Sequence, residues 1–310
     1  MGKERMSMAQ RVFSKKRRGL GLALGLVLGL FGISRAFSAG SDPAMVDLGG
    51  SSTAVPAQPA NPETKPSPTE QLSLRVNLPA TRLDLYVNGK FDRSYNVAIG
   101  MPKYPTPIRD YSISHIVWNP WWIPPDSEWA QDAEKTPPGP GNPLGAVKLL
   151  MEDGIRIHGT NAPRSIGRAS SHACLRMRSE DIKALAWKIQ QAYSDKTDPE
   201  LLEMYKKNPR STFWVTLFAG VPVTVEYRQV ETRGDKFLIH PDRYGRGGLQ
   251  EELEAAFSGH PDLAVTKPLL AKLKKLRGKG TVEASPQELT QWSLGEEPQS
   301  SPESLPAKKS

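Results

Sequence analysis

The chain has 310 residues, of which 38% are hydrophobic and 24% are charged. This balance is typical of a soluble globular protein with polar tails, and the length is enough for one or two domains. The formal net charge is +8, but residues 1–35 hold eight of the 41 basic residues and only one of the 33 acidic ones. Because the remainder is almost neutral, no basic binding face is indicated and no nucleic-acid partner is expected.

The N-terminal segment has the pattern of an export signal. Four consecutive basic residues, Lys15 to Arg18, precede an apolar run over residues 20–33, which is shorter than the roughly 20 residues of a full membrane span. Residues 1–39 are therefore predicted to be either a cleaved signal peptide or an uncleaved anchor, the one expected membrane contact. Both alternatives place the protein in the periplasm or cell envelope. Residues 40–71, rich in Pro, Ser and Ala, are predicted to be a linker.

Alternating apolar and polar residues predict that order begins with β-strands. The predicted strands cover residues 72–78, 83–87, 91–99 and 111–115, two strands within 147–157, and closing strands within 213–227. Asn88-Gly89 separates two of these runs and predicts a hairpin with a type I′ turn. Residues 117–145, rich in Pro, Gly and Trp, are predicted to be a long irregular loop.

Helical spacing appears later in the chain. Ser179 is predicted to cap a helix over residues 179–193, followed by a short second helix over 198–207. Residues 229–281 are predicted to be a partly helical extension, with helices at 249–257 and 268–276, and residues 282–310 to be a disordered tail. The fold class predicted for the ordered core is mainly β with one or two helices.

The chain has one cysteine, Cys174, and two of its five histidines, His158 and His172, lie within 17 residues of it. A single cysteine excludes an intrachain disulfide, and a lone thiol is most often buried and inert. A thiol attacks carbonyls as the thiolate, and a nearby imidazole can take its proton. A partial zinc site is the alternative, but no fourth ligand is evident, so no metal or cofactor is expected. The residues themselves indicate a cysteine acyl-transfer enzyme.

This region closely resembles the catalytic signature of the L,D-transpeptidase (YkuD) family. The matching segments are His158-Gly159-Thr160-Asn161, Ile166-Gly167 and Ser171-His172-Ala173-Cys174-Leu175-Arg176-Met177. Further matches are Asn119-Pro120-Trp121 with Ile123-Pro124-Pro125, Pro138 to Gly145, the strand Arg82 to Tyr86, and Val221 to Val225. The resemblance covers about residues 72–228 in the family's order, and it implies the family's β-sandwich-like catalytic domain there. The helical C-terminal extension predicted from the spacing lies outside this match.

The resemblance also implies roles for the site residues. Cys174 would be the nucleophile, and His158 the general base oriented by the Gly159 carbonyl. His172 and Ser171 would line the site and bind the substrate, and the backbone N–H groups of Ala173 and Cys174 would form the oxyanion hole. Arg176 would hold either the site loop or a substrate carboxylate. Trp118, Trp121 and Trp122 would form a lid, or pack in the core.

The implied reaction is an acyl transfer on peptidoglycan stem peptides. Cys174 would attack the carbonyl before the terminal D-alanine of a tetrapeptide stem, and an amine would resolve the thioester, giving a 3–3 cross-link. A wall-anchored lipoprotein could supply the amine instead, and water would make the protein an L,D-carboxypeptidase. No cofactor is implied.

Two departures from the family pattern leave a non-catalytic wall-binding or scaffolding protein as the rival interpretation. Ala173 and Arg109 both stand where the family has Gly. If position 173 requires a positive φ, the Ala methyl introduces strain of about 1 kcal/mol.

Overall fold

The structure is a computed structural model, and it describes residues 67–296. The predicted export signal, most of the predicted linker and the end of the chain lie outside the described residues. Within residues 67–296, no helix is both long and apolar enough to cross a bilayer.

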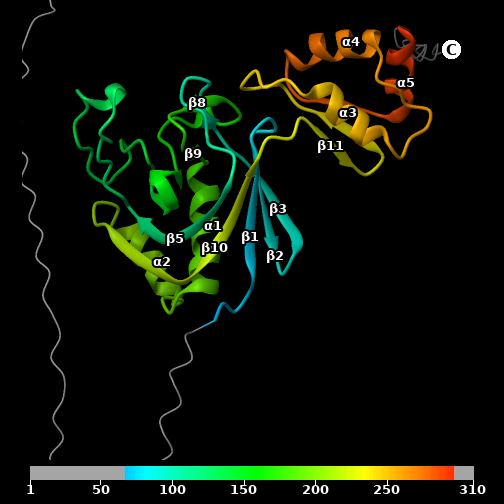
Figure 1. The fold of residues 1–310 in the computed structure, drawn as a ribbon. Helices are drawn as coiled ribbons and strands as arrows, with labels where there is room; N and C mark the ends of the chain where they lie inside the picture. The colour runs from blue at the N-terminus through cyan, green and yellow to red at the C-terminus, as the bar shows by residue number, and fades with distance from the viewer. Residues whose placement is uncertain (1–66, 297–310) are drawn as a thin grey trace, which may run out of the picture. The chain divides into compact units, whose positions relative to one another are not determined.

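An eight-stranded sheet forms the first part of the described chain (Figure 1). Its strand order is β3-β2-β1-β10-β5-β6-β7-β9. The bounds are β1 Leu72–Asn77, β2 Arg82–Val87, β3 Lys90–Asn96, β5 Asp110–Trp118, β6 Val147–Leu150, β7 Arg156–His158, β9 Leu175–Arg176 and β10 Phe213–Glu226. Two short strands, β4 Ile99–Gly100 and β8 Ala169–Ser171, form a separate parallel pair.

The pairing joins the two ends of this domain. β1 lies between β2, to which it runs antiparallel, and β10, to which it runs parallel. The predicted turn between β2 and β3 is confirmed: Asn88 and Gly89 have φ of 51° and 76°, as a type I′ turn requires. β10 is one long strand with an irregularity between Thr216 and Val221, where the sequence predicted several closing strands.

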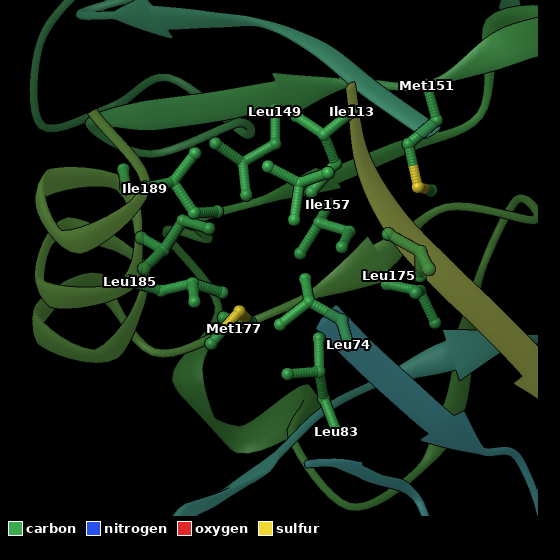
Figure 2. Packing of buried hydrophobic residues seen from close by; sticks show 14 of the residues in the cluster. Leu74, Leu83, Ile113, Leu149, Met151, Ile157, Leu175, Met177, Leu185 and Ile189 are labelled. Atoms are coloured by element: carbon green, nitrogen blue, oxygen red, sulfur yellow. The ribbon is translucent and has the colours of Figure 1, made fainter. Parts of the chain in front are cut away.

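Helices α1 (Ser179–Tyr193) and α2 (Pro199–Lys207) follow the catalytic-signature segment. Leu185 and Ile189 of α1 are buried and point toward sheet residues such as Leu149 and Ile157 (Figure 2). This is the apolar face that the helical spacing predicted. Ser179 was predicted to be the N-cap, but it is the first helical residue. Arg178 occupies the cap position, and its side chain makes no capping hydrogen bond.

The segment between β5 and β6 is irregular and contains the short helix η1 (Glu128–Ala130). It is fastened by Asn142, whose fully buried amide donates to the carbonyls of Pro120, Thr136 and Pro137 at 2.9–3.1 Å. Gly145 follows with φ of 63°, and a Cβ there would lie 2.8 Å from the Thr160 nitrogen. The loop can therefore pass close to the end of β7 only with glycine at this position.

Residues 230–294 form a second, smaller core. Strands β11 (Val230–Arg233), β12 (Lys236–Ile239) and β13 (Val282–Ala284) make a three-stranded sheet. Helices α3 (Leu249–Phe257), α4 (Lys267–Arg277) and α5 (Pro286–Leu294) accompany it. Phe237, Leu253, Leu273 and Trp292 are among the residues buried there.

The extension contains helices α3 and α4 and also the sheet β11-β12-β13, which the sequence did not predict. One prediction for this region is wrong. The tail is not disordered from residue 282, because β13 and α5 pack into this core. Strands of three or four residues are too short for an alternating pattern to be detected. In α5 the buried residues Leu289 and Trp292 stand among polar residues, so the helical pattern was not recognised. A capping box at Ser285 and Glu288 was the available signal.

The fold class is confirmed as mainly β. The sheet core is a single curled eight-stranded sheet with the β4-β8 pair beside it. The helix count exceeds the predicted one or two, because α3, α4 and α5 follow the sheet domain.

Candidate active site

Strand pairing brings Cys174 and His158 into one groove. Cys174 lies in the turn between β8 and β9, and β9 pairs in parallel with β7, so that His158 is opposite Arg176. The groove has a volume of about 390 Å³, and His158, Ser171, His172, Cys174 and Arg176 all line it. The residues predicted from the signature are thus gathered, apart from the backbone groups discussed below. Among the described residues, no group of three or more His, Cys, Asp or Glu side chains is placed to hold a metal ion.

His158 is a buried, neutral imidazole. Its Nδ1 lies 2.5 Å from the Gly159 carbonyl oxygen, which is the contact that the resemblance implied. Burial, together with the charges of Arg176, Arg156 and Lys148, lowers the pKa of His158 to about 3 against the raising effect of this hydrogen bond. Because Nδ1–H donates to the carbonyl, Nε2 keeps its lone pair and can accept a proton.

Ala173 has a left-handed backbone, with φ of 69°. The family Gly at this position therefore corresponds to a conformation that an L side chain rarely adopts. The Ala173 N–H donates to the Tyr104 carbonyl at 3.1 Å, and the Ala173 carbonyl accepts from Thr106 Oγ1 at 2.8 Å. Both peptide groups of this residue are therefore engaged by the segment 104–106.

The Ala173 half of the predicted oxyanion hole is contradicted by this arrangement. An N–H that already donates to a carbonyl is not free to stabilise a developing oxyanion. The Cys174 N–H, by contrast, has no hydrogen-bond partner among the described residues. Sequence reasoning missed this because the partner, Tyr104, is distant along the chain.

Ser171 supports the turn. It is almost fully buried, its hydroxyl donates to the Cys174 carbonyl, and its carbonyl accepts from the Met101 N–H at 2.8 Å. The hydroxyl is thus occupied in fixing the backbone of the cysteine. The same turn is held from the other side by Thr106, whose Oγ1 accepts from the Gly100 N–H at 2.9 Å.

His172 lies between two aromatic rings that the sequence did not single out. It stacks on Trp129, with ring centroids 3.8 Å apart and an interplanar angle of 8°, and it contacts Tyr104 at 4.8 Å. Burial lowers the pKa of His172, with further lowering from Arg176 and Lys103. Trp129 lies in the irregular loop among other tryptophans, and no spacing distinguishes it from them.

The three tryptophans that were considered for a lid have different positions. Trp118 is buried, stacks on Tyr205 and donates to Gln190 at 2.8 Å, so it belongs to the core. Trp122 lines the groove. Trp121 is exposed and faces a different hollow.

Arg176 presents an unpaired guanidinium to the groove. Its Nε is buried without a hydrogen-bond partner, and no ion pair to Arg176 exists among residues 67–296. Burial lowers the pKa of Arg176, and the Cys174 sulfur opposes this. A half-buried cation beside the thiol favours both a thiolate and a bound carboxylate.

Arg109 does not disturb the site. It forms an ion pair with Asp153 and lies over the Tyr111 ring at 4.4 Å. It is absent from the described residues with positive φ, so the missing glycine costs no backbone strain here.

A mainly β domain with a cysteine and a carbonyl-oriented histidine in one groove defines a candidate cysteine acyl-transfer site. The family model for the YkuD L,D-transpeptidase catalytic domain matches residues 72–225. The chain belongs to this L,D-transpeptidase catalytic-domain family.

Two curated relatives agree with this family. The chain is 31% identical over 138 residues to the protein named L,D-transpeptidase YkuD of Bacillus subtilis, covering 44% of this chain and 68% of that one. It is 32% identical over 127 residues to the protein of the same name from Bacillus licheniformis, covering 41% of this chain and 62% of that one. A solved L,D-transpeptidase from Mycobacterium smegmatis matches 51% of this chain and 59% of its own at 17% identity, with a TM-score of 0.31. The chain thus spans about three fifths of the first relatives it matches.

Proposed function

We propose that this protein is a peptidoglycan L,D-transpeptidase in which Cys174 is the nucleophile and His158 the general base. The observation that carries the proposal is the pairing of β7 with β9, which sets a neutral, carbonyl-oriented imidazole and the chain's one thiol in the same groove. Family membership supports the same activity.

In the proposed first step, His158 Nε2 takes the proton of the Cys174 thiol. The Cys174 sulfur forms a bond to the carbonyl carbon before the terminal D-alanine of a tetrapeptide stem, and the Cys174 N–H stabilises the oxyanion. The amide C–N bond then breaks, His158 returns the proton to the leaving nitrogen, and D-alanine departs, leaving a thioester on Cys174.

In the second step, an amine attacks the thioester carbonyl and gives up a proton to His158. The C–S bond breaks, the thiol is regenerated and a new amide is formed. A stem-peptide side-chain amine would give a 3–3 cross-link, an amine of a wall lipoprotein would attach that protein, and water would give L,D-carboxypeptidase activity. We propose the stem peptide as the acceptor.

Two further residues have roles in this proposal. Arg176 binds a carboxylate of the stem peptide, because its half-buried guanidinium lacks a carboxylate partner among the described residues. His172, held between Trp129 and Tyr104, forms a wall of the groove. The substrate lies in the cell envelope, which agrees with the export signal predicted within residues 1–39.

The test uses a carbapenem, whose strained amide carbonyl can acylate an activated thiolate. Intact-mass measurement should show one adduct per chain on the wild type and none on Cys174→Ala, because the chain has a single thiol. His158→Gln should slow acylation by at least about 100-fold, the usual contribution of a positioned base, whereas the control His115→Gln on β5 should not.

Incubation with tetrapeptide muropeptides identifies the acceptor. Mass spectrometry should find 3–3 dimers with the wild type and none with Cys174→Ala. Tripeptide products without dimers would show that water, and not an amine, resolves the thioester. An unlabelled wild type that also leaves muropeptides intact would contradict the proposal and favour the non-catalytic alternative.

A further inference from the structure

A second cavity lies beside the segment that leads to the nucleophile. It has a volume of about 570 Å³, and its lining includes Gly167 and Arg168, which precede β8. The rest of the lining comes from residues 241–243 and from the C-terminal end of α4 and the turn after it. It shares no lining residue with the groove around Cys174.

The lining of this cavity is strongly basic. Five of its ten lining residues are cationic: Arg168, Arg243, Lys274, Arg277 and Lys279. One is a carboxylate, Asp242, and the others are Pro241 and three glycines. None of the five cations forms an ion pair with a carboxylate within the described part of the chain.

Asp242 does not neutralise the cavity by direct pairing. Its oxygens accept from the Tyr227 hydroxyl at 2.5 Å and from the N–H groups of Arg246 and Gly247 at 2.9 and 2.8 Å. Its charge and that of Glu252 do reach Arg277. Glu252, however, is occupied by the Gln229 and Val230 N–H groups.

Two of the cations are partly desolvated. Burial lowers the pKa of Arg243 and of Arg277. The Arg243 Nε has only a 3.5 Å contact with the Pro79 carbonyl. The Arg277 guanidinium donates to the neutral Gln229 Oε1 at 3.1 Å, and its Nε is buried without a partner. Removing a guanidinium from water without an anionic partner is unfavourable, so the folded chain keeps these charges at a cost that a bound anion would offset.

Capping of α4 does not explain the cluster. Lys274 and Arg277 lie in the last turn of α4, where cations interact favourably with the helix dipole. Arg168 and Arg243, however, come from two other segments and converge on the same cavity. The convergence of three segments is what a site for an anion requires.

The geometry points to a phosphate-binding site in this cavity, and we propose that it takes a phosphate group carried by a component of the cell envelope. The cavity has five cations and one carboxylate, whose oxygens are already hydrogen-bonded. The net positive charge is therefore larger than the single negative charge of a carboxylate ligand could balance. A guanidinium group can donate two parallel hydrogen bonds to two oxygens of one phosphate. The lining has no aromatic side chain, which disfavours recognition of a base or of an apolar side chain.

The experiment measures binding by the full chain at constant ionic strength. Inorganic pyrophosphate, titrated calorimetrically, represents a phosphate free in solution or on a soluble polymer. Vesicles of phosphatidylglycerol, compared with vesicles of phosphatidylcholine, represent a lipid headgroup. Sodium acetate at matched ionic strength is the carboxylate control.

Two double variants distinguish binding in the cavity from non-specific attraction to the protein's positive charge. Lys274→Gln with Lys279→Gln removes two exposed cavity cations without touching either hydrophobic core, and Arg243→Gln with Arg277→Gln removes the partly buried pair. The control, Lys267→Gln with Lys275→Gln, removes the same charge from α4 at exposed positions outside the cavity. We expect at least about tenfold weaker binding in both cavity variants and less than about twofold in the control.

The outcomes are distinct. Loss of pyrophosphate binding in the cavity variants supports the site for a soluble phosphate. Loss confined to phosphatidylglycerol vesicles supports a lipid headgroup as its source. Equal weakening in the control variant, or no weakening in the Lys274 and Lys279 variant, overturns the proposal, as does equal or tighter binding of acetate.

Discussion

Ala173 combines an unfavourable backbone conformation with a position next to Cys174. An L residue at φ of 69° loses roughly 1 kcal/mol relative to glycine. The two hydrogen bonds that Tyr104 and Thr106 make with its peptide groups hold it in place. The methyl group deletes no donor, so its effect falls on stability more than on chemistry.

Ala173→Gly should therefore raise the free energy of unfolding by about 0.5 kcal/mol, since the relief of strain exceeds the added entropy of the unfolded chain. Urea denaturation measures this, and the carbapenem acylation rate should stay within about twofold. The control is Ala162→Gly, at φ of −118°, which should be neutral or destabilising. A large loss of acylation in Ala173→Gly would contradict this account of the turn.

His158 makes stability depend on pH. In the folded protein its pKa is about 3, whereas in the unfolded chain it is near 6.5. Between these values only the unfolded state binds the proton, so stability is full above about pH 6.5 and falls as the pH decreases toward 3.

The wild type should lose up to about 1.4 kcal/mol per pH unit from this residue on acidification below pH 6. Urea unfolding at pH 7, 6 and 5 measures the slope. His158→Gln should flatten it, while His115→Gln should leave it unchanged. Identical slopes for the wild type and His158→Gln would show that folding does not lower the pKa of His158.

At the level of elements, hydrogen bonds link the C-terminal residues to the cysteine turn. The Tyr244 hydroxyl accepts from the Thr106 N–H at 3.2 Å, and Thr106 in turn holds the Ala173 carbonyl. The Tyr244 N–H donates to the Tyr227 hydroxyl at 2.8 Å. Tyr244 is thus a positioning residue that lies outside the family match.

Tyr244→Phe should slow carbapenem acylation several-fold, because the Thr106 N–H loses its acceptor and the turn before Cys174 loosens. Stability should fall by about 1 kcal/mol, the usual value of one hydrogen bond. Tyr86→Phe is the control, since the Tyr86 hydroxyl has no hydrogen bond among the described residues. The acylation rate of each variant is measured the same number of degrees below its own melting temperature. An unchanged acylation rate would show that Tyr244 contributes to stability and not to the position of Cys174.

Local patterns predicted much of the fold, and the family signature indicated side chains that line one groove in the structure. The alternation in β1 and β2, the Asn88-Gly89 turn and the face of α1 are all local signals. The partners of Ala173 and His172 were not predictable, because Tyr104, Thr106 and Trp129 reach them only through the tertiary fold. The same applies to β11, β12 and β13, whose short lengths leave no periodicity and whose burial depends on helices elsewhere in the chain.

In the molecule as a whole, a polar cluster joins the sheet domain to the C-terminal core. Arg82 binds Glu231 with two hydrogen bonds of 2.8 and 2.9 Å. Asn77 and His240 each contact the same carboxylate at 2.9 Å. Burial would raise the pKa of Glu231, but the hydrogen bonds from His240 and Arg82 hold it well below its usual value.

Glu231→Gln should lower the free energy of unfolding by about 2 kcal/mol, because Arg82 and His240 lose a charged acceptor and Arg82 keeps only Asp84 as its counter-charge. Calorimetry should then resolve separate melting of residues 230–294. The control is Glu226→Gln, which breaks the more exposed pair with Arg228 and should cost at most about 1 kcal/mol. A single unshifted transition in Glu231→Gln would mean that the cluster does not couple the two cores.

The parallel pairing of β1 with β10 has a consequence for how the chain acquires its structure. Leu74 pairs with Val223, so the first strand of the sheet domain gains its central neighbour only when the last strand is present. A chain emerging N-terminus first can form the β2-β3 hairpin early, yet it must wait for residue 226 before the sheet closes. Such long-range closure makes folding slow, and it leaves the edge of β1 open to other chains until the final strand arrives.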